Sequence, residues 1–128
     1  MKVLNFEDSV YKANAIRKVL NQCGVAKIEL VSNVEDGLQM LKNAEDAGAP
    51  FDLIITDMHY PMKQGAVSDT EAGEKLVQLL QEQGKQTKVI VCSSRNMKLP
   101  GVYGCIWYSE ISDWEEELCD LVREMEKN

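Results

Sequence analysis

The chain has a single histidine, His59, and its four cysteines form no CxxC or CxxH pair. A zinc site needs clustered cysteine or histidine ligands, so the sequence offers no zinc-binding pattern. The cysteines are Cys23, Cys92, Cys105 and Cys119, and two of them fall within apolar, strand-like runs. This distribution predicts buried free thiols in a reducing cytoplasm.

Basic residues are also in short supply, with 14 lysines and arginines against 21 acidic residues and a net charge of −7. Nucleic-acid binding depends largely on basic side chains that neutralise phosphates, so we expect no nucleic-acid partner. The sequence lacks an apolar run of transmembrane length. Glu7 and Asp8 interrupt the start of the chain, which therefore does not resemble a secretory signal. We expect a cytoplasmic protein with no membrane partner.

The sequence shows no internal repeat, low-complexity tract or linker-like change in composition. With 45% hydrophobic residues, a chain of 128 residues can bury one core but is too short for two ordinary domains. We therefore predict a single domain over residues 1–128.

Strand-like and helix-like segments alternate along the whole chain. The predicted strands are Lys2 to Phe6, Ile28 to Val31, Phe51 to Thr56, Lys88 to Cys92 and Cys105 to Tyr108. Helical spacing separates them, and Ser112 with Glu115 predicts a capping box for a last helix. Two strands are apolar without alternation, which indicates that both of their faces are covered. The pattern predicts an α/β fold, a doubly wound parallel sheet with helices on both faces.

Polar side chains follow the predicted strands at the point where each strand ends. Glu7 and Asp8 follow the first strand, Asp57 follows the third, and Ser93 follows the fourth. The carboxyl ends of parallel strands share one edge of a sheet, where the ligands of doubly wound folds bind. Crowded carboxylates repel one another unless a cation joins them, and Mg²⁺ prefers such oxygen ligands. A metal-screened Asp57 could then act as a nucleophile toward a phosphoryl group.

Each of these positions also has an ordinary structural interpretation. An acidic residue after an apolar strand is often a turn former or a helix cap, as Asp8 or Ser9 could be for the first helix. The joint placement of the carboxylates and the serine is what favours a site over this alternative.

Three segments resemble the receiver domain of bacterial response regulators, the family of the chemotaxis regulator. They are KVLNFEDS, DLIITDMHYPMKQG with its D-x-x-x-P-x-x-x-G loop, and VIVCSS. The resemblance covers essentially the whole chain. It implies a flavodoxin-like sheet of five strands in the order 2-1-3-4-5.

The resemblance also implies a role for each site residue. Asp57 would be the phosphoacceptor, Asp8 a direct Mg²⁺ ligand and Glu7 a ligand acting through water. His59 would offer its backbone carbonyl to the metal. Ser93 would be the switch hydroxyl that follows the phosphoryl group, and phosphorylation would shift the surface formed by the later elements.

One departure from the family lies at the end of the fifth strand, where a lysine normally pairs with the phosphoryl group. Here Tyr108 and Ser109 hold that place. A tyrosine donates a hydrogen bond but carries no positive charge. Arg95 or Lys63 are the candidates to supply the missing cation.

Other departures concern the segments around the site. Pro100 and Gly101 lie in the short interval between Ser93 and Gly104, so the fourth helix of the family is predicted to be short or missing. The segment Ala66 to Lys75 is longer than the corresponding segment of the family. It could be a lid over the site or a loop that binds a partner, but we favour an insertion without a function of its own. The family has an aromatic switch residue whose ring rotates, and the resemblance would put Cys105 at that position.

These features support two functions from different classes. The first is a stand-alone response regulator that receives a phosphoryl group from a histidine kinase or phosphotransfer protein and signals to an unknown output protein by contact. The second is a pseudo-receiver that binds partners without phosphorylation. A phosphohydrolase would need a second acid-base group, for which His59 is the one histidine candidate. We expect no enzyme beyond catalysis of the chain's own phosphorylation and dephosphorylation.

Overall fold

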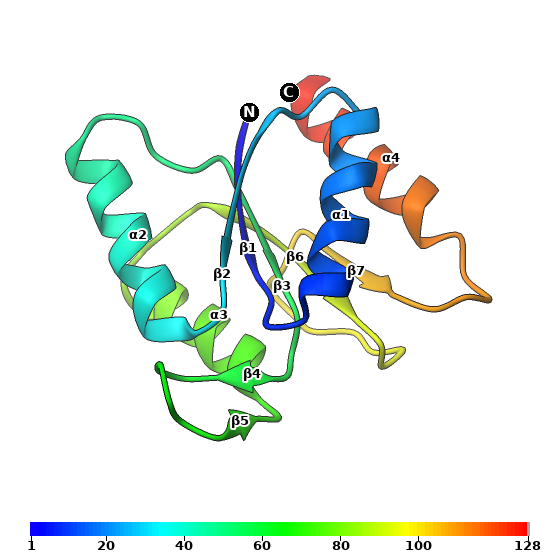
Figure 1. Ribbon diagram of the computed structural model, residues 1–128. Helices are drawn as coiled ribbons and strands as arrows, with labels where there is room; N and C mark the ends of the chain where they lie inside the picture. Colours follow the sequence, from blue (N-terminus) through cyan, green and yellow to red (C-terminus); the bar gives the residue numbers. More distant parts are fainter. Residues whose placement is uncertain (128) are drawn as a thin grey trace.

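A computed structural model describes residues 1–127 (Figure 1). The elements in chain order are β1 (Lys2–Phe6), α1 (Val10–Gln22), β2 (Lys27–Val31), α2 (Val34–Asp46), β3 (Leu53–Thr56), β4 (Tyr60–Pro61), β5 (Ser68–Asp69), α3 (Ala72–Glu82), β6 (Lys88–Ser93), β7 (Gly104–Trp107) and α4 (Trp114–Lys127).

Five of the strands form one parallel sheet in the order β2-β1-β3-β6-β7. Counted along the chain, this is the predicted order 2-1-3-4-5, so the predicted doubly wound fold is confirmed. The central strands β1, β3 and β6 are almost wholly buried, as expected for strands whose two faces are both covered by helices.

Alternate residues of each strand pack into two separate cores. Leu4, Phe6 and Ile54 face the core under α2 and α3. Val3 and Ile55 face the opposite core, which α1 and α4 cover. Figure 1 shows these two helix pairs on the two sides of the sheet. The carboxyl ends of β1, β3 and β6 therefore open together at one edge of the sheet.

The connections depart from regular helix and strand in the places the sequence indicates. Residues 94–103, between β6 and β7, form no helix, which confirms the predicted loss of the fourth helix. In the long segment after Asp57, β4 and β5 pair antiparallel, with Tyr60 opposite Asp69 and Pro61 opposite Ser68. This short hairpin lies against the carboxyl edge of the sheet (Figure 1).

The predicted capping box of the last helix is wrong. The helix begins at Trp114, and the carbonyl of Asp113 accepts the N–H of Glu117. The Ser112 hydroxyl instead donates to the carbonyls of Trp107, at 2.6 Å, and Ser109, at 3.0 Å. A hydroxyl near a strand end can satisfy backbone carbonyls instead of capping, and the sequence motif does not distinguish the two.

The prediction of four free thiols is also wrong. Cys23, which ends α1, forms a disulfide with Cys119 of α4, and the two Cα atoms lie 5.7 Å apart. Cys92 and Cys105 are free. The two bonded cysteines are 96 residues apart in sequence. They meet because α1 and α4 pack side by side, a contact that cysteine spacing does not reveal.

Candidate functional site: an acidic pocket at the strand ends

Backbone hydrogen bonds continue the sheet into the residues that carry the site. The N–H of Glu7 donates to the Val31 carbonyl at 2.9 Å, and the N–H of Asp57 donates to the Phe6 carbonyl at 3.1 Å. These two residues therefore keep the register of β1 and β3. Their side chains are held side by side by the most buried part of the molecule.

Glu7, Asp8 and Asp57 form a cluster in which one carboxylate oxygen of each lies within 4.8 Å of the others. Glu7 is buried, Asp57 is partly buried and Asp8 is exposed. Asp57 Oδ1 accepts the N–H of Met58 at 2.7 Å. The sequence predicted this convergence, and the fold brings the three side chains together at the edge where a ligand of a doubly wound sheet would bind.

The cluster contains a cation that sequence reasoning missed. Lys12 Nζ lies 2.9 Å from Glu7 Oε1 and 3.3 Å from Asp57 Oδ1, and it donates to the Cys92 carbonyl at 2.6 Å. The Lys12 side chain is only 9% exposed. The sequence does contain a signal for this contact. The spacing of Lys12 from Ile16 and Val19 puts the lysine on the buried face of the helix.

The start of α1 fixes Lys12 in this position. Ser9 is the N-cap, and its hydroxyl oxygen accepts the N–H of Lys12. Glu7 Oε2 in turn accepts the N–H of Ser9 at 3.1 Å. Ser9, and not Asp8, is therefore the helix cap, which leaves the Asp8 carboxylate available to the cluster.

Burial and charge oppose each other in this group. Burial raises the pKa of Glu7 above its ordinary value, although the Lys12 ammonium partly offsets the effect. Burial alone would lower the pKa of Lys12, but the negative groups around it, including Asp57 and Glu7, raise it overall. The ammonium is therefore charged at neutral pH and offsets part of the negative charge of the cluster.

A pocket of about 270 Å³ opens beside the carboxylates. Its lining residues are Asp8, Asp57, Met58, His59, Ser68, Ser93, Ser94 and Arg95. Ser93 is buried at the end of β6, and its Oγ accepts the N–H of Arg95 at 3.1 Å. The hydroxyl predicted from sequence thus shares a pocket with Asp57. The exposed residue His59 lies at its rim, and no contact of its carbonyl tests the predicted metal role.

The fold is similar to those of solved response regulator structures. The receiver domain of Francisella response regulator 1452 superposes with a TM-score of 0.72 at 20% identity, over 98% of this chain and 96% of that one. Chemotaxis response regulator CheY4 of Vibrio cholerae gives a TM-score of 0.66 at 21% identity, over 97% of both chains. The chain has the fold of a response regulator receiver domain. Its sequence matches no protein-family model, and no curated protein is similar to it in sequence.

Within this receiver fold, Tyr108 follows β7 at the place where the resemblance implies a lysine. Its N–H donates to the Ser93 carbonyl at 2.8 Å, so it continues the register of the sheet. Its ring centroid lies 4.9 Å from that of Trp114 and 5.3 Å from Lys12 Nζ. Tyr108 thus packs beside the Lys12 ammonium and against Trp114.

Neither of the two cations proposed from sequence to replace the family lysine forms an ion pair with Asp57. The exposed residue Arg95 lines the pocket, but its guanidinium donates to the Thr70 carbonyl at 3.3 Å. Lys63 is exposed and lines an apolar hollow with Met62 and Leu79. Among residues 1–127, Lys12 is the one lysine or arginine in an ion pair with Asp57.

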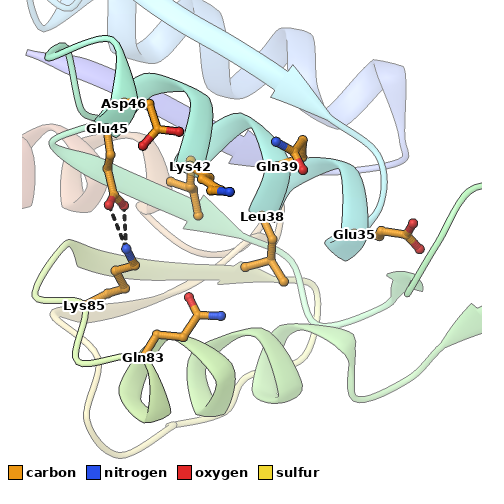
Figure 2. A pocket seen from close by; sticks show the side chains of 9 residues that line it. Glu35, Leu38, Gln39, Lys42, Glu45, Asp46, Gln83 and Lys85 are labelled. Carbon is orange, nitrogen blue, oxygen red and sulfur yellow. Dashed lines mark hydrogen bonds and ion pairs between the residues drawn. The ribbon is translucent and has the colours of Figure 1, made fainter.

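A larger hollow of about 520 Å³ lies over α2 and the end of α3, away from the strand ends (Figure 2). An ion pair between Lys85 and Glu45, with Nζ 2.7 Å from Oε2, spans it (Figure 2). Its lining carries charges of both signs, and within residues 1–127 the three acidic side chains close enough together to hold a metal ion are those of Glu7, Asp8 and Asp57. The acidic pocket is therefore the better candidate site, although it is smaller.

Within residues 1–127, no helix combines the length and the apolar character needed to cross a bilayer.

Proposed function

We propose that this chain is a response regulator receiver that accepts a phosphoryl group on Asp57 with the help of Mg²⁺. The observation that carries the proposal is the meeting of three carboxylates within 4.8 Å of one another, in a receiver fold and beside a pocket that Ser93 also lines. A carboxylate is a competent nucleophile for phosphoryl transfer when positive charge screens it from the incoming group.

The donor set fits a hard divalent cation. Glu7 Oε1 is buried and receives no aligned hydrogen bond, although Lys12 lies close to it, so it still has a lone pair to offer. Asp8 and Asp57 would be direct ligands, Glu7 would act through water, and His59 would add its backbone carbonyl. Mg²⁺ bound there would supply charge neutralisation for the phosphoryl oxygens.

The protein side of the reaction is simple. An Asp57 carboxylate oxygen attacks the phosphorus of a phosphohistidine on a histidine kinase or phosphotransfer protein. A new O–P bond forms, the N–P bond breaks, and the imidazole keeps the electron pair. The Ser93 hydroxyl then donates a hydrogen bond to a phosphoryl oxygen. Beyond this and the later hydrolysis of its own acyl phosphate, the chain would catalyse no reaction.

The signal would leave the domain through contacts with another protein. Phosphorylation adds charge and acceptor oxygens at the edge formed by Ser93 and the segment after it. Residues 94–103 carry no helix, so the output surface would differ from one built on a fourth helix. The net charge of −7 argues against nucleic acid as the partner. The location that we propose is the cytoplasm.

The test is incubation of the protein with Mg²⁺ and acetyl phosphate, followed by intact-mass spectrometry. We expect one added phosphoryl group in the wild type, none in Asp57→Ala, and normal addition in Asp46→Asn, which replaces an exposed aspartate of α2. An unmodified wild-type protein that also ignores beryllofluoride would favour the pseudo-receiver. Release of many phosphates per Asp57 from a free phosphate ester would instead indicate a phosphohydrolase.

A further inference from the structure

Lys12 occupies the centre of the acidic site although the function proposed above does not require it. Three oxygens surround its ammonium, which donates a hydrogen bond to the first and forms ion pairs with the other two. They are the Cys92 carbonyl at 2.6 Å, Glu7 Oε1 at 2.9 Å and Asp57 Oδ1 at 3.3 Å. These oxygens belong to residues at the ends of β6, β1 and β3. The ammonium is thus held over the same three strands whose ends form the site.

A buried ammonium in contact with the proposed nucleophile affects the energy of phosphoryl transfer to it, because the charge at Asp57 changes in the reaction. When a phosphoryl group joins Asp57, the carboxylate becomes a mixed anhydride and loses its negative charge. The phosphoryl oxygens carry about two negative charges in its place. The 3.3 Å contact to Asp57 is the longest of the three, so it is the one most readily exchanged for a contact to a phosphoryl oxygen.

We propose that Lys12 is the cation that binds a phosphoryl oxygen on Asp57, supplied by the first turn of α1 and not by the end of β7. This inference rests on the proposed function. The contacts to Cys92 and Glu7 anchor the ammonium, while the contact to Asp57 is replaced by a charge-assisted hydrogen bond to the phosphoryl group. No proton is transferred, and Lys12 is charged throughout.

The surroundings of Lys12 support this assignment over a purely structural role. The ammonium lies over the ring of Tyr108, with 5.3 Å between Nζ and the ring centroid, so it faces an aromatic ring as well as the carboxylates. The Trp114 ring packs against that of Tyr108, at a centroid distance of 4.9 Å. A lysine at position 108 would compete with Lys12 for the same acceptors. A tyrosine at position 108 carries no ammonium and leaves these acceptors to Lys12.

The test compares the wild type with Lys12→Met and with the double variant Lys12→Met/Tyr108→Lys, which moves the ammonium to the end of β7. Lys18→Met is the control, because Lys18 lies exposed on the same helix. The probes are Mg²⁺ alone, measured by calorimetry, and beryllofluoride in excess Mg²⁺, measured by fluorine NMR.

We expect Lys12→Met to weaken beryllofluoride binding by about tenfold or more, because a charge-assisted hydrogen bond is lost. The same variant should bind Mg²⁺ at least as tightly as the wild type, because the cluster becomes more negative. The double variant should recover beryllofluoride binding, and Lys18→Met should match the wild type. A merely structural lysine would lower both affinities together and would not be rescued from position 108.

The inference is overturned if Lys12→Met binds beryllofluoride within about twofold of the wild type, or if both affinities fall together without rescue. If the wild type itself binds no beryllofluoride, the proposed function fails first and the role of Lys12 fails with it. If Lys12→Met does not fold, Lys12→Gln replaces it under the same criteria, since its amide can still donate to the Cys92 carbonyl.

Discussion

The ring of Tyr108 lies beside the ammonium of Lys12, with 5.3 Å between Nζ and the ring centroid. Both residues lie near the edge of the sheet where β1, β3 and β6 end, but Lys12 comes from α1 and Tyr108 follows β7. An aromatic ring offers a cation its negatively polarised face without competing for the carboxylates. Lys12 can therefore keep its contacts with Glu7 and Asp57, and Tyr108 stabilises it there.

The ring, and not the hydroxyl, of Tyr108 should matter for stability. We expect Tyr108→Phe to change the free energy of unfolding by less than about 0.5 kcal/mol, because both ring contacts survive. Tyr108→Ala should cost about 2 kcal/mol, since it removes the contacts with Lys12 and Trp114 at a partly exposed position. Urea denaturation measures both values. Equal losses in the two variants would contradict a role for the ring.

Glu7 should make the stability of the metal-free protein depend on pH. Burial raises the pKa of Glu7 above its ordinary value of 4.5, so the folded protein binds this proton more tightly than the unfolded chain. The resulting stabilisation is fully present below about pH 4.5 and is lost as the pH rises through the folded-state pKa. Glu7→Gln has no proton to lose. Its stability relative to the wild type should therefore increase as the pH rises from about 4.5 to about 7.5.

The measurement for Glu7 is denaturant unfolding in the presence of EDTA across this pH range. Glu29→Gln, on the exposed edge strand β2, controls for the replacement of a glutamate at the surface. A difference between wild type and Glu7→Gln that stays constant with pH, or that shrinks as the pH rises, would refute the prediction.

Gly73 should not tolerate a side chain, although it lies within α3. A Cβ atom at this position would lie 2.3 Å from the Asp57 carbonyl oxygen and 3.0 Å from Met58 Cα. Alanine normally stabilises a helix by about 1 kcal/mol relative to glycine. Here the clash with backbone outweighs that gain, and we expect Gly73→Ala to lower the free energy of unfolding by about 1–3 kcal/mol.

The control for Gly73 is Gln78→Ala, an exposed substitution in the same helix that should change stability by no more than about 0.5 kcal/mol. Because the clash falls on the backbone of Asp57, Gly73→Ala should also slow modification by acetyl phosphate. A Gly73→Ala protein more stable than the wild type would show that the glycine is not required.

The disulfide between Cys23 and Cys119 should contribute measurably to stability. It joins the end of α1 to α4 across a sequence separation of 96. We expect reduction to lower the free energy of unfolding by about 2–4 kcal/mol. Thermal unfolding with and without reductant tests this, and a Cys23→Ser/Cys119→Ser protein should not respond to reductant. If the untreated wild type already exposes four alkylatable thiols after denaturation, the bond does not form.

Sequence reasoning went furthest where a pattern is local. Apolar strands without alternation, such as Leu53 to Thr56, indicated strands covered on both faces, and the parallel sheet has them at its centre. Acidic residues directly after the first and third predicted strands predicted the cluster of Glu7, Asp8 and Asp57, because parallel strands end at one edge. Pro100 and Gly101 similarly predicted the loss of a helix between β6 and β7.

It failed where a contact joins distant segments. The sequence left Arg95 and Lys63 as candidates for the missing cation, and the structure puts Arg95 at the pocket and Lys63 at a different hollow, because side-chain reach and direction decide such a contact. Lys12 was overlooked because a lysine three residues after a helix cap is usually solvent-exposed. Ser112 was predicted to be a cap from its spacing to Glu115 alone. Its actual partners, the carbonyls of Trp107 and Ser109, depend on the path of the chain after β7.

The sequence by itself thus determined the order of strands and helices, the burial of the central strands and the set of carboxylates that end them. These properties follow from periodicity and from the common direction of parallel strands. The tertiary structure alone decided that Lys12 lies among the carboxylates, that Tyr108 packs beside it, and that Cys23 meets Cys119. The reason is physical: each of these contacts depends on how α1 packs against the sheet and α4, and that packing is the summed outcome of many side chains far apart in the chain.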